Sequence, residues 1–99
     1  MHQHQYQTIT TWQDKTFTKA TALSCVHHLV EEVQELKTDL ENGTINHEEI
    51  ADCFLLLFAV CNKLGLNYEA VVKLIDDKMN INYQRTWGEP NELGYVKHV

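Results

Sequence analysis

The fold of this chain is decided by one uninterrupted apolar stretch, Cys53-Phe54-Leu55-Leu56-Leu57-Phe58-Ala59-Val60-Cys61. It follows Asn46, a favourable helix N-cap with Glu49 three residues further on, and it precedes Gly65. These signals predict a helix over residues 47–64 rather than a buried strand. A helix that is apolar on all sides must be covered on all sides. Because so short a chain offers few neighbours, we expect a second subunit to complete a helical bundle by two-fold association.

Two further helices are expected on either side of this segment. Apolar residues recur at helical spacing over residues 21–42, and Gly43 ends the pattern. A third amphipathic pattern covers residues 67–86. Residues 1–20 form an N-terminal extension with room for a short helix, and residues 87–99 form an irregular tail. The sequence therefore predicts an all-α protein with three main helices, in one domain that spans the whole chain.

The first of these helices has two chemically different sides. Its apolar side, which we expect to face the bundle, consists of Val26, Val30, Val33 and Leu40, with Leu29 and Leu36 beside them. Its outer side carries Lys37, Asp39 and Glu41.

Composition excludes several classes of function. Fourteen acidic residues against eight basic ones give a formal charge of -6, with no basic block that would bind nucleic acid. The longest apolar run is far shorter than the roughly 20 residues of a membrane span, and the N-terminus lacks a signal-peptide pattern. Cys25, Cys53 and Cys61 are odd in number and form no Cys-x-x-Cys pair, so we interpret them as reduced core residues. We expect a cytoplasmic protein that binds neither nucleic acid nor membrane.

Four carboxylates are predicted to meet between the first two of these helices. Glu32 and Glu35 are three residues apart on one helix, and Glu49 and Asp52 are three apart on the next, so each pair shares a helix face. The connection is short, which makes the helices antiparallel neighbours and brings both pairs to the same level. Crowded carboxylates require protonation or a cation, and all-oxygen ligands suit Mg2+, with Mn2+ as a substitute. The alternative is that the glutamates form a solvated helix face.

A row of phosphate-binding groups follows on the third predicted helix. Lys78, Asn82 and Arg85 are spaced four and three residues apart, and they continue an apolar line that includes Val71 and Leu74. Arg85 offers a planar fork and Lys78 a point charge for phosphate oxygens. The alternative is that these cations form structural salt bridges. Acidic metal ligands together with phosphate-binding bases favour a nucleotide phosphate site.

These motifs match a known family. The pattern Glu31-Glu32-Val33-Gln34-Glu35, followed after 13 residues by Glu49-Ile50-Ala51-Asp52, resembles the Glu-x-x-Glu, spacer, Glu-x-x-Asp signature of the MazG-like all-α nucleoside triphosphate pyrophosphohydrolases. The C-terminal pattern of the small phage-type and mobile-element members, the dATP/dGTP pyrophosphohydrolases, is similar to a downstream set here, namely Lys78, Asn82, Arg85-Thr86-Trp87, Gly94 and His98.

The resemblance implies a reaction and its residues. A nucleoside triphosphate would be cleaved between its α and β phosphates to a monophosphate and pyrophosphate, as a nucleotide-pool house-cleaning step. The implied metal ligands are Glu32, Glu35, Glu49 and Asp52, of which Glu32 or Glu35 would also act as the catalytic general base. The implied phosphate-binding residues are Lys78, Asn82 and Arg85. The implied assembly is a homodimer, or a tetramer formed from two dimers.

The nucleobase and the wider function are less constrained by the sequence. Aromatic side chains that can stack on a base are Trp12, Phe17 and Trp87, each of which is also a candidate core or lid anchor. A dUTPase-like enzyme and a phosphoribosyl-ATP pyrophosphohydrolase relative share the acidic cluster. A non-enzymatic helical interaction module, with surface acids and an apolar oligomer seam, also stays open. A di-iron bundle is disfavoured because its Glu-x-x-His pairs are missing.

Overall fold

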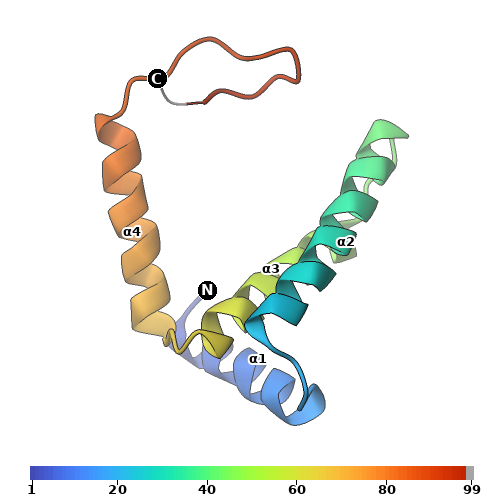
Figure 1. The fold of residues 1–99 in the computed structure, drawn as a ribbon, viewed down its shortest axis with the longest axis vertical. Helices are drawn as coiled ribbons and strands as arrows, with labels where there is room; N and C mark the ends of the chain where they lie inside the picture. The colour runs from blue at the N-terminus through green and yellow to red at the C-terminus, as the bar shows by residue number, and fades with distance from the viewer. Residues whose placement is uncertain (98–99) are drawn as a thin grey trace. The chain divides into compact units, whose positions relative to one another are not determined.

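The computed structural model describes residues 1–97, and these residues form four helices joined by short connections (Figure 1). The helices are α1 (Gln3–Thr16), α2 (Ala22–Glu41), α3 (His47–Lys63) and α4 (Tyr68–Gln84). The chain divides into two compact units, one from Met1 to Glu69 and one from Ala70 onward. The all-α class is confirmed. None of the helices in the described residues is long and apolar enough to cross a membrane.

The N-terminal extension is a full helix of 14 residues, which corrects the expectation of three main helices. Its buried positions, Tyr6 and Thr10, lie one turn apart and both carry hydroxyl groups. The Tyr6 hydroxyl donates to the Leu66 carbonyl at 2.8 Å, and the Gln13 amide donates to the Leu55 carbonyl at 2.9 Å. Because each polar tip finds a backbone partner, a stripe with few purely apolar residues can still be buried.

α2 and α3 form the antiparallel hairpin that the short connection predicts, and α1 packs against α3. Gly43 has φ +76°, a left-handed conformation that ends α2 at little steric cost. Asn46 caps α3 as predicted, because its side chain accepts a hydrogen bond from the Glu48 backbone N–H at 3.1 Å. These two residues fix where one helix ends and the next begins.

The row of α2 side chains that is covered differs from the apolar stripe expected from the sequence. The covered row has alternating three- and four-residue spacing and consists of Ala22, Cys25, Leu29, Glu32, Leu36 and Asp39. Asp39 was expected on the outer side, whereas Val30, expected to face the bundle, is 62% exposed. The spacing is that of a coiled-coil seam in which two acids occupy positions that are usually apolar.

The second unit holds most of α4. The apolar line predicted along this helix is covered only in part, because Val71 is buried while Leu74 and Ile75 are about half exposed. An amphipathic helix with half-exposed apolar residues has its apolar face incompletely covered within this chain.

The tail beyond Gln84 has no helix in its described part, residues 85–97. Asn91 organises a turn there, since its side-chain oxygen accepts from the backbone N–H groups of Leu93 and Tyr95 at 3.0 and 3.1 Å. His98, which belongs to the family-like C-terminal pattern, lies outside the described residues.

Candidate active site

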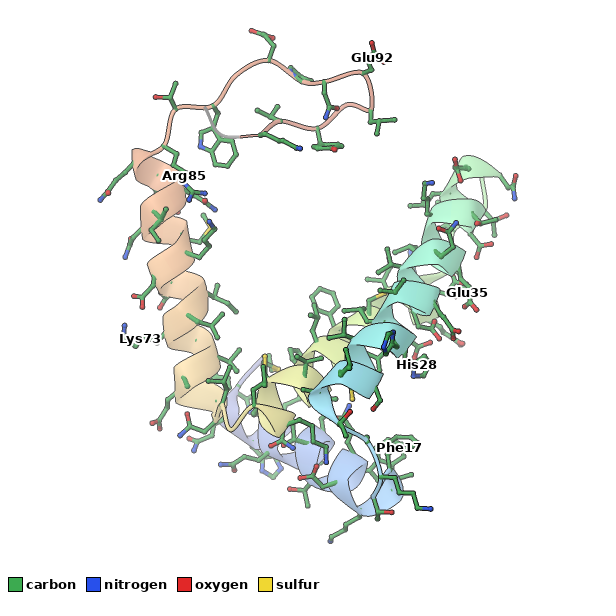
Figure 2. The ribbon with its side chains drawn as sticks, in the orientation of Figure 1. Phe17, His28, Glu35, Lys73, Arg85 and Glu92 are labelled. Atoms are coloured by element: carbon green, nitrogen blue, oxygen red, sulfur yellow. The ribbon has the colours of Figure 1, made fainter. Side chains whose placement is uncertain are left out.

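Glu32 is a carboxylate of α2 that the hairpin largely covers. Its side chain is only 15% exposed, and its Oε1 lies 3.3 Å from Nε2 of His28, one helical turn earlier. Glu35 follows one turn later and is exposed, as the side-chain view of α2 shows (Figure 2). The two glutamates predicted from the sequence therefore differ in environment, one held in the seam and the other open to solvent.

Glu49 lies in the first turns of α3, opposite these residues. Its Oε2 is buried and has no hydrogen-bond partner. Burial, followed by the nearby carboxyl groups of Asp39, Glu35 and Glu32, raises the pKa of Glu49. Glu49 thus has three acidic neighbours and an unpaired oxygen, so its surroundings lack positive charge.

Asp52 stands one turn after Glu49 and is exposed. Its charge acts on Cys53, because burial together with the charges of Glu32, Asp52 and Glu49 raises the pKa of that thiol. The hairpin thus brings all four predicted acids into one neighbourhood.

Asp39 is a fifth member of this acidic cluster, and the prediction that it lies on the outer face of its helix is wrong. The signal that identifies it is the three- and four-residue spacing that links it to Cys25, Leu29, Glu32 and Leu36. The cluster consists of Glu32, Glu35, Asp39, Glu49 and Asp52. Within residues 1–97, no three acidic, histidine or cysteine side chains converge closely enough to form a preformed cation site. The acids are therefore neighbours whose side chains are not arranged as a closed coordination shell.

A cavity of about 380 Å³ adjoins two of these acids within the first unit. Glu32 and Asp52 line it from α2 and α3, and the aromatic side chains of Trp12 and Phe17 line it from α1 and its C-cap. The two rings meet edge to face, with centroids 5.5 Å apart. Trp12 is 58% exposed, so its ring is accessible rather than sealed in a core. Two aromatic residues predicted to bind a base thus share one cavity with two predicted metal ligands.

The end of the cavity that lies about ten residues along α3 from Asp52 is polar. Asn62 Nδ2 donates to both carboxylate oxygens of Asp14, at 3.1 and 3.0 Å, and Lys63 Nζ lies 3.1 Å from Asp14 Oδ1. These hydrogen bonds, led by that from Asn62, hold the pKa of Asp14 below its usual range. Gln13 lines the same cavity beside Leu55, whose carbonyl accepts from its amide nitrogen, and its Oε1 is buried without a hydrogen-bond partner. The sequence pattern did not indicate these polar groups, because Asp14 and Asn62 are 48 residues apart along the chain.

The predicted phosphate-binding residues belong to the second unit. Lys78 and Asn82 lie on α4, and Arg85 follows directly after its last residue, as labelled in Figure 2. Asn82 Oδ1 is buried and has no hydrogen-bond partner. Trp87, the third aromatic candidate, lies in the same unit and donates from its indole N–H to the Asn82 carbonyl at 3.0 Å. This hydrogen bond ties Trp87 to the end of α4.

The chain is similar to a known family in sequence and to a solved structure in fold. A family model described as dATP/dGTP pyrophosphohydrolase matches residues 5–99, across both units. Among solved structures, the fold is similar to that of the cyanophage S-2L MazG-like pyrophosphohydrolase bound to dGDP and three catalytic Mn2+ ions per active site. The TM-score is 0.81 and the identity 23%, over 100% of this chain and 94% of that one. No curated protein matches the sequence.

The likeness to the cyanophage structure shows the same fold, a MazG-like all-α arrangement. The family assignment comes from the sequence model, which covers nearly the whole chain. This chain belongs to the dATP/dGTP pyrophosphohydrolase family and is a nucleoside triphosphate pyrophosphohydrolase.

Proposed function

We propose that this enzyme hydrolyses purine deoxyribonucleoside triphosphates to the monophosphate and pyrophosphate, as a step that clears such nucleotides from the pool. One observation carries the proposal: Glu32 and Asp52 of the acidic cluster line the same cavity as the accessible rings of Trp12 and Phe17. These groups suit a nucleotide. The acids would hold a cation near its phosphates, and an aromatic ring would stack on its base.

A divalent cation fits this acidic cluster. The buried, unpartnered Oε2 of Glu49 is an acceptor without a donor, and burial together with the neighbouring carboxyl groups raises the pKa of that group. Hard oxygen ligands suit Mg2+, with Mn2+ as a substitute. The residues that would hold the ion are Glu32, Glu35, Glu49 and Asp52. When bound, the ion would supply charge neutralisation on the triphosphate and a lowered pKa for an attacking water.

The chain's own residues would perform the remaining tasks. Glu35 is the better placed of the two candidate bases, because it is solvent-accessible, whereas Glu32 is paired with His28. Lys78, Asn82 and Arg85 would bind phosphate oxygens, because the ammonium, the side-chain amide nitrogen and the guanidinium all donate hydrogen bonds. Trp12 and Phe17 would present ring faces to the base.

The chain also presents an uncovered apolar face on its α2–α3 hairpin. On α2 its exposed members are Leu23, Val26, Val30, Val33 and Leu40. On α3 they are Ile50, Phe54 and Leu57, and Leu64 follows at the C-cap of this helix. Each α2 member directly follows a covered residue of the seam. On α3, Ile50, Phe54 and Leu57 likewise follow the covered residues Glu49, Cys53 and Leu56. One residue along a helix corresponds to a rotation of about 100°. Because the helices are antiparallel, that rotation turns both rows to the same side of the hairpin.

A second copy of this chain is the occupant that fits this face. The two rows form one apolar surface on a hairpin, and packing it on its two-fold equivalent yields a four-helix bundle. Much apolar surface remains to be buried, since only four apolar side chains are buried in the described residues although 43% of the chain is apolar. The face lies opposite the cavity, whose lining includes residues that precede the seam, such as His28 and Leu55. Dimerisation would therefore leave this cavity open, and two dimers would give a tetramer.

The product mixture tests the proposed reaction. In heavy-oxygen water with Mg2+, attack at the α phosphorus places the label in the monophosphate and leaves the pyrophosphate unlabelled. Release of orthophosphate, or label in the pyrophosphate, would contradict the proposed cleavage. Absence of turnover with every nucleotide, in a folded and oligomeric sample, would favour the non-enzymatic interaction module instead.

A further inference from the structure

The imidazole of His28 borders the acidic cluster from outside it. His28 lies on α2, one turn before Glu32, and its Nε2 is 3.3 Å from Oε1 of that carboxylate. Both residues line the cavity, and Asp52 lines it from α3. His28 is therefore next to one predicted metal ligand and to the space in which the substrate would bind.

Helix geometry brings these two side chains together. Residues four apart lie on one face of a helix, and a long side chain leans toward the helix N-terminus. The carboxylate of Glu32 thus extends over the turn that carries His28, where Oε1 and not Oε2 lies beside the imidazole. The Glu32 side chain is covered by the seam, so the contact with His28 fixes a carboxylate that has little freedom elsewhere.

Glu32 needs such a contact because its other neighbours in the cluster are acids. Glu35 and Asp39 follow it on α2, and Glu49 and Asp52 lie on α3. Like charges drive carboxylates apart, whereas the ligands of one cation must point toward a common centre. A ring N–H that holds one oxygen in place opposes this repulsion. Hydrogen bonds from outer groups orient ligating carboxylates in metal sites generally.

We propose that His28 is a positioning residue of the metal site, whose ring N–H holds Oε1 of Glu32 so that this carboxylate stays beside Asp52 at the cavity. The inference rests on the proposed function, because it takes Glu32 as a metal ligand. It extends that function by giving a role to a side chain outside the acidic cluster. A neutral imidazole with its proton on Nε2 can donate, so the role does not require a charged histidine.

Mn2+ binding to the nucleotide-free protein tests this role without relying on turnover. EPR counts free and bound Mn2+ at one pH for the wild type, His28→Ala and His28→Gln. We expect His28→Ala to raise the Kd for Mn2+ by about tenfold, as loss of an outer-shell partner does in other metal sites. The amide nitrogen of a glutamine can donate from near the position of Nε2, so His28→Gln should regain most of the affinity.

His27→Ala is the matched control, since it removes the preceding histidine, which is exposed and lies outside the cavity lining. It should bind Mn2+ like the wild type. The variants at position 28 should keep their Tm in EDTA, because the His28 side chain is 58% exposed and such a pair contributes little to stability. A change in Mn2+ affinity would then not come from unfolding.

Two further readouts separate positioning from direct contact. At saturating Mn2+, His28→Ala should recover the KM for dGTP and most of kcat, because excess metal fills the weakened site. A KM that stays raised would make His28 a nucleotide contact and overturn the inference. Spin-echo EPR of Mn2+ bound to the wild type should show no directly coordinated nitrogen, and an imidazole signal would make His28 a metal ligand instead.

An unchanged Kd for Mn2+ in a folded His28→Ala would also overturn the inference. The same holds if His28→Gln binds no better than His28→Ala, because the N–H donor would then not be the cause. These results leave the proposed hydrolysis standing. A wild type that binds Mn2+ but cleaves no nucleotide would remove the proposed reaction alone, and one that binds no Mn2+ would remove the metal site together with this role of His28.

Discussion

Burial and the nearby carboxyl group of Asp39, near the end of α2, raise the pKa of Glu49, near the start of α3. Two acids that meet across a helix seam oppose folding unless a proton or a cation lies between them. Glu32 and Glu35 add their charges to Glu49, and Asp52 follows one turn later on α3. The hairpin therefore concentrates negative charge at one level, next to a cavity with aromatic walls.

Removing one charge from this acidic cluster should stabilise the metal-free protein. Glu49→Gln keeps the shape of the side chain and relieves repulsion from Asp39, Glu35 and Glu32, so we expect the Tm in EDTA to rise by a few degrees. The Tm gain on adding Mg2+ should shrink at the same time, because a ligand is lost. Thermal unfolding with and without Mg2+ measures both effects. Glu48→Gln is the matched control, since Glu48 is the exposed neighbour, and equal behaviour of the two variants would contradict the prediction.

Arg85 should contribute to binding of the triphosphate and much less to binding of the metal. Arg85→Ala removes a planar donor for phosphate oxygens, so we expect KM to rise by about tenfold or more. The Mg2+ concentration for half-maximal activity should change little. Steady-state kinetics at varied nucleotide and varied Mg2+ concentrations separate the effect on nucleotide binding from the effect on metal binding. Lys73→Ala on α4 is the control for loss of a positive charge. An unchanged KM and kcat would show that Arg85 is structural.

A charge in the centre of the apolar face should prevent self-association. Val30→Glu places an acid where the proposed dimer has none, and we expect the dimer dissociation constant to rise by ~100-fold or more. Sedimentation equilibrium over a range of concentrations measures this constant. Thr8→Glu adds the same side chain at an exposed position on α1 and should leave the dimer intact. A wild-type protein that is monomeric at high concentration would contradict the proposed assembly.

Tyr6 should make the stability of the first unit sensitive to alkaline pH. Burial, and to a smaller extent the charge of the Cys61 thiolate, raises the pKa of Tyr6, whose hydroxyl donates to the Leu66 carbonyl. The folded state thus favours the neutral phenol, so its stabilisation is complete below the unfolded pKa and is lost as pH rises through the folded pKa. Tyr6→Phe should cost about 1 kcal/mol at neutral pH and remove this part of the alkaline dependence.

Urea unfolding of the wild type and Tyr6→Phe, at neutral pH and above pH about 10, tests this prediction. Tyr83→Phe is the control, because Tyr83 is 77% exposed. The difference between wild type and Tyr6→Phe should narrow at the higher pH, and a constant difference would show that the phenol does not titrate within the transition.

The hairpin that carries the acids was predictable from local signals. Asn46 as an N-cap and Gly43 as a stop define where α3 begins and α2 ends, and both work through backbone chemistry close to them in sequence. The three-residue spacing within each acidic pair then follows from helix geometry. These features need no knowledge of distant contacts.

Other features depend on which face a helix buries, and the predictions of the buried faces were wrong. α1 buries Tyr6 and Thr10, whose polar atoms find backbone carbonyl partners only in the folded chain. Asp39 lies in the seam because α2 turns a less apolar row than the valine stripe toward α3. The pairing of Asp14 with Asn62 joins positions 48 residues apart, and no local pattern indicates it.

Pyrophosphate release from dGTP tests most directly whether the acidic cluster holds the catalytic cation. It is measured for the wild type, Glu49→Gln and Glu48→Gln, each with Mg2+, with Mn2+ and with EDTA. If the acidic cluster holds the catalytic cation, the wild type and Glu48→Gln release pyrophosphate with either metal and none in EDTA, while Glu49→Gln stays inactive although folded. Pyrophosphate release in EDTA, or full activity of Glu49→Gln, would contradict the account.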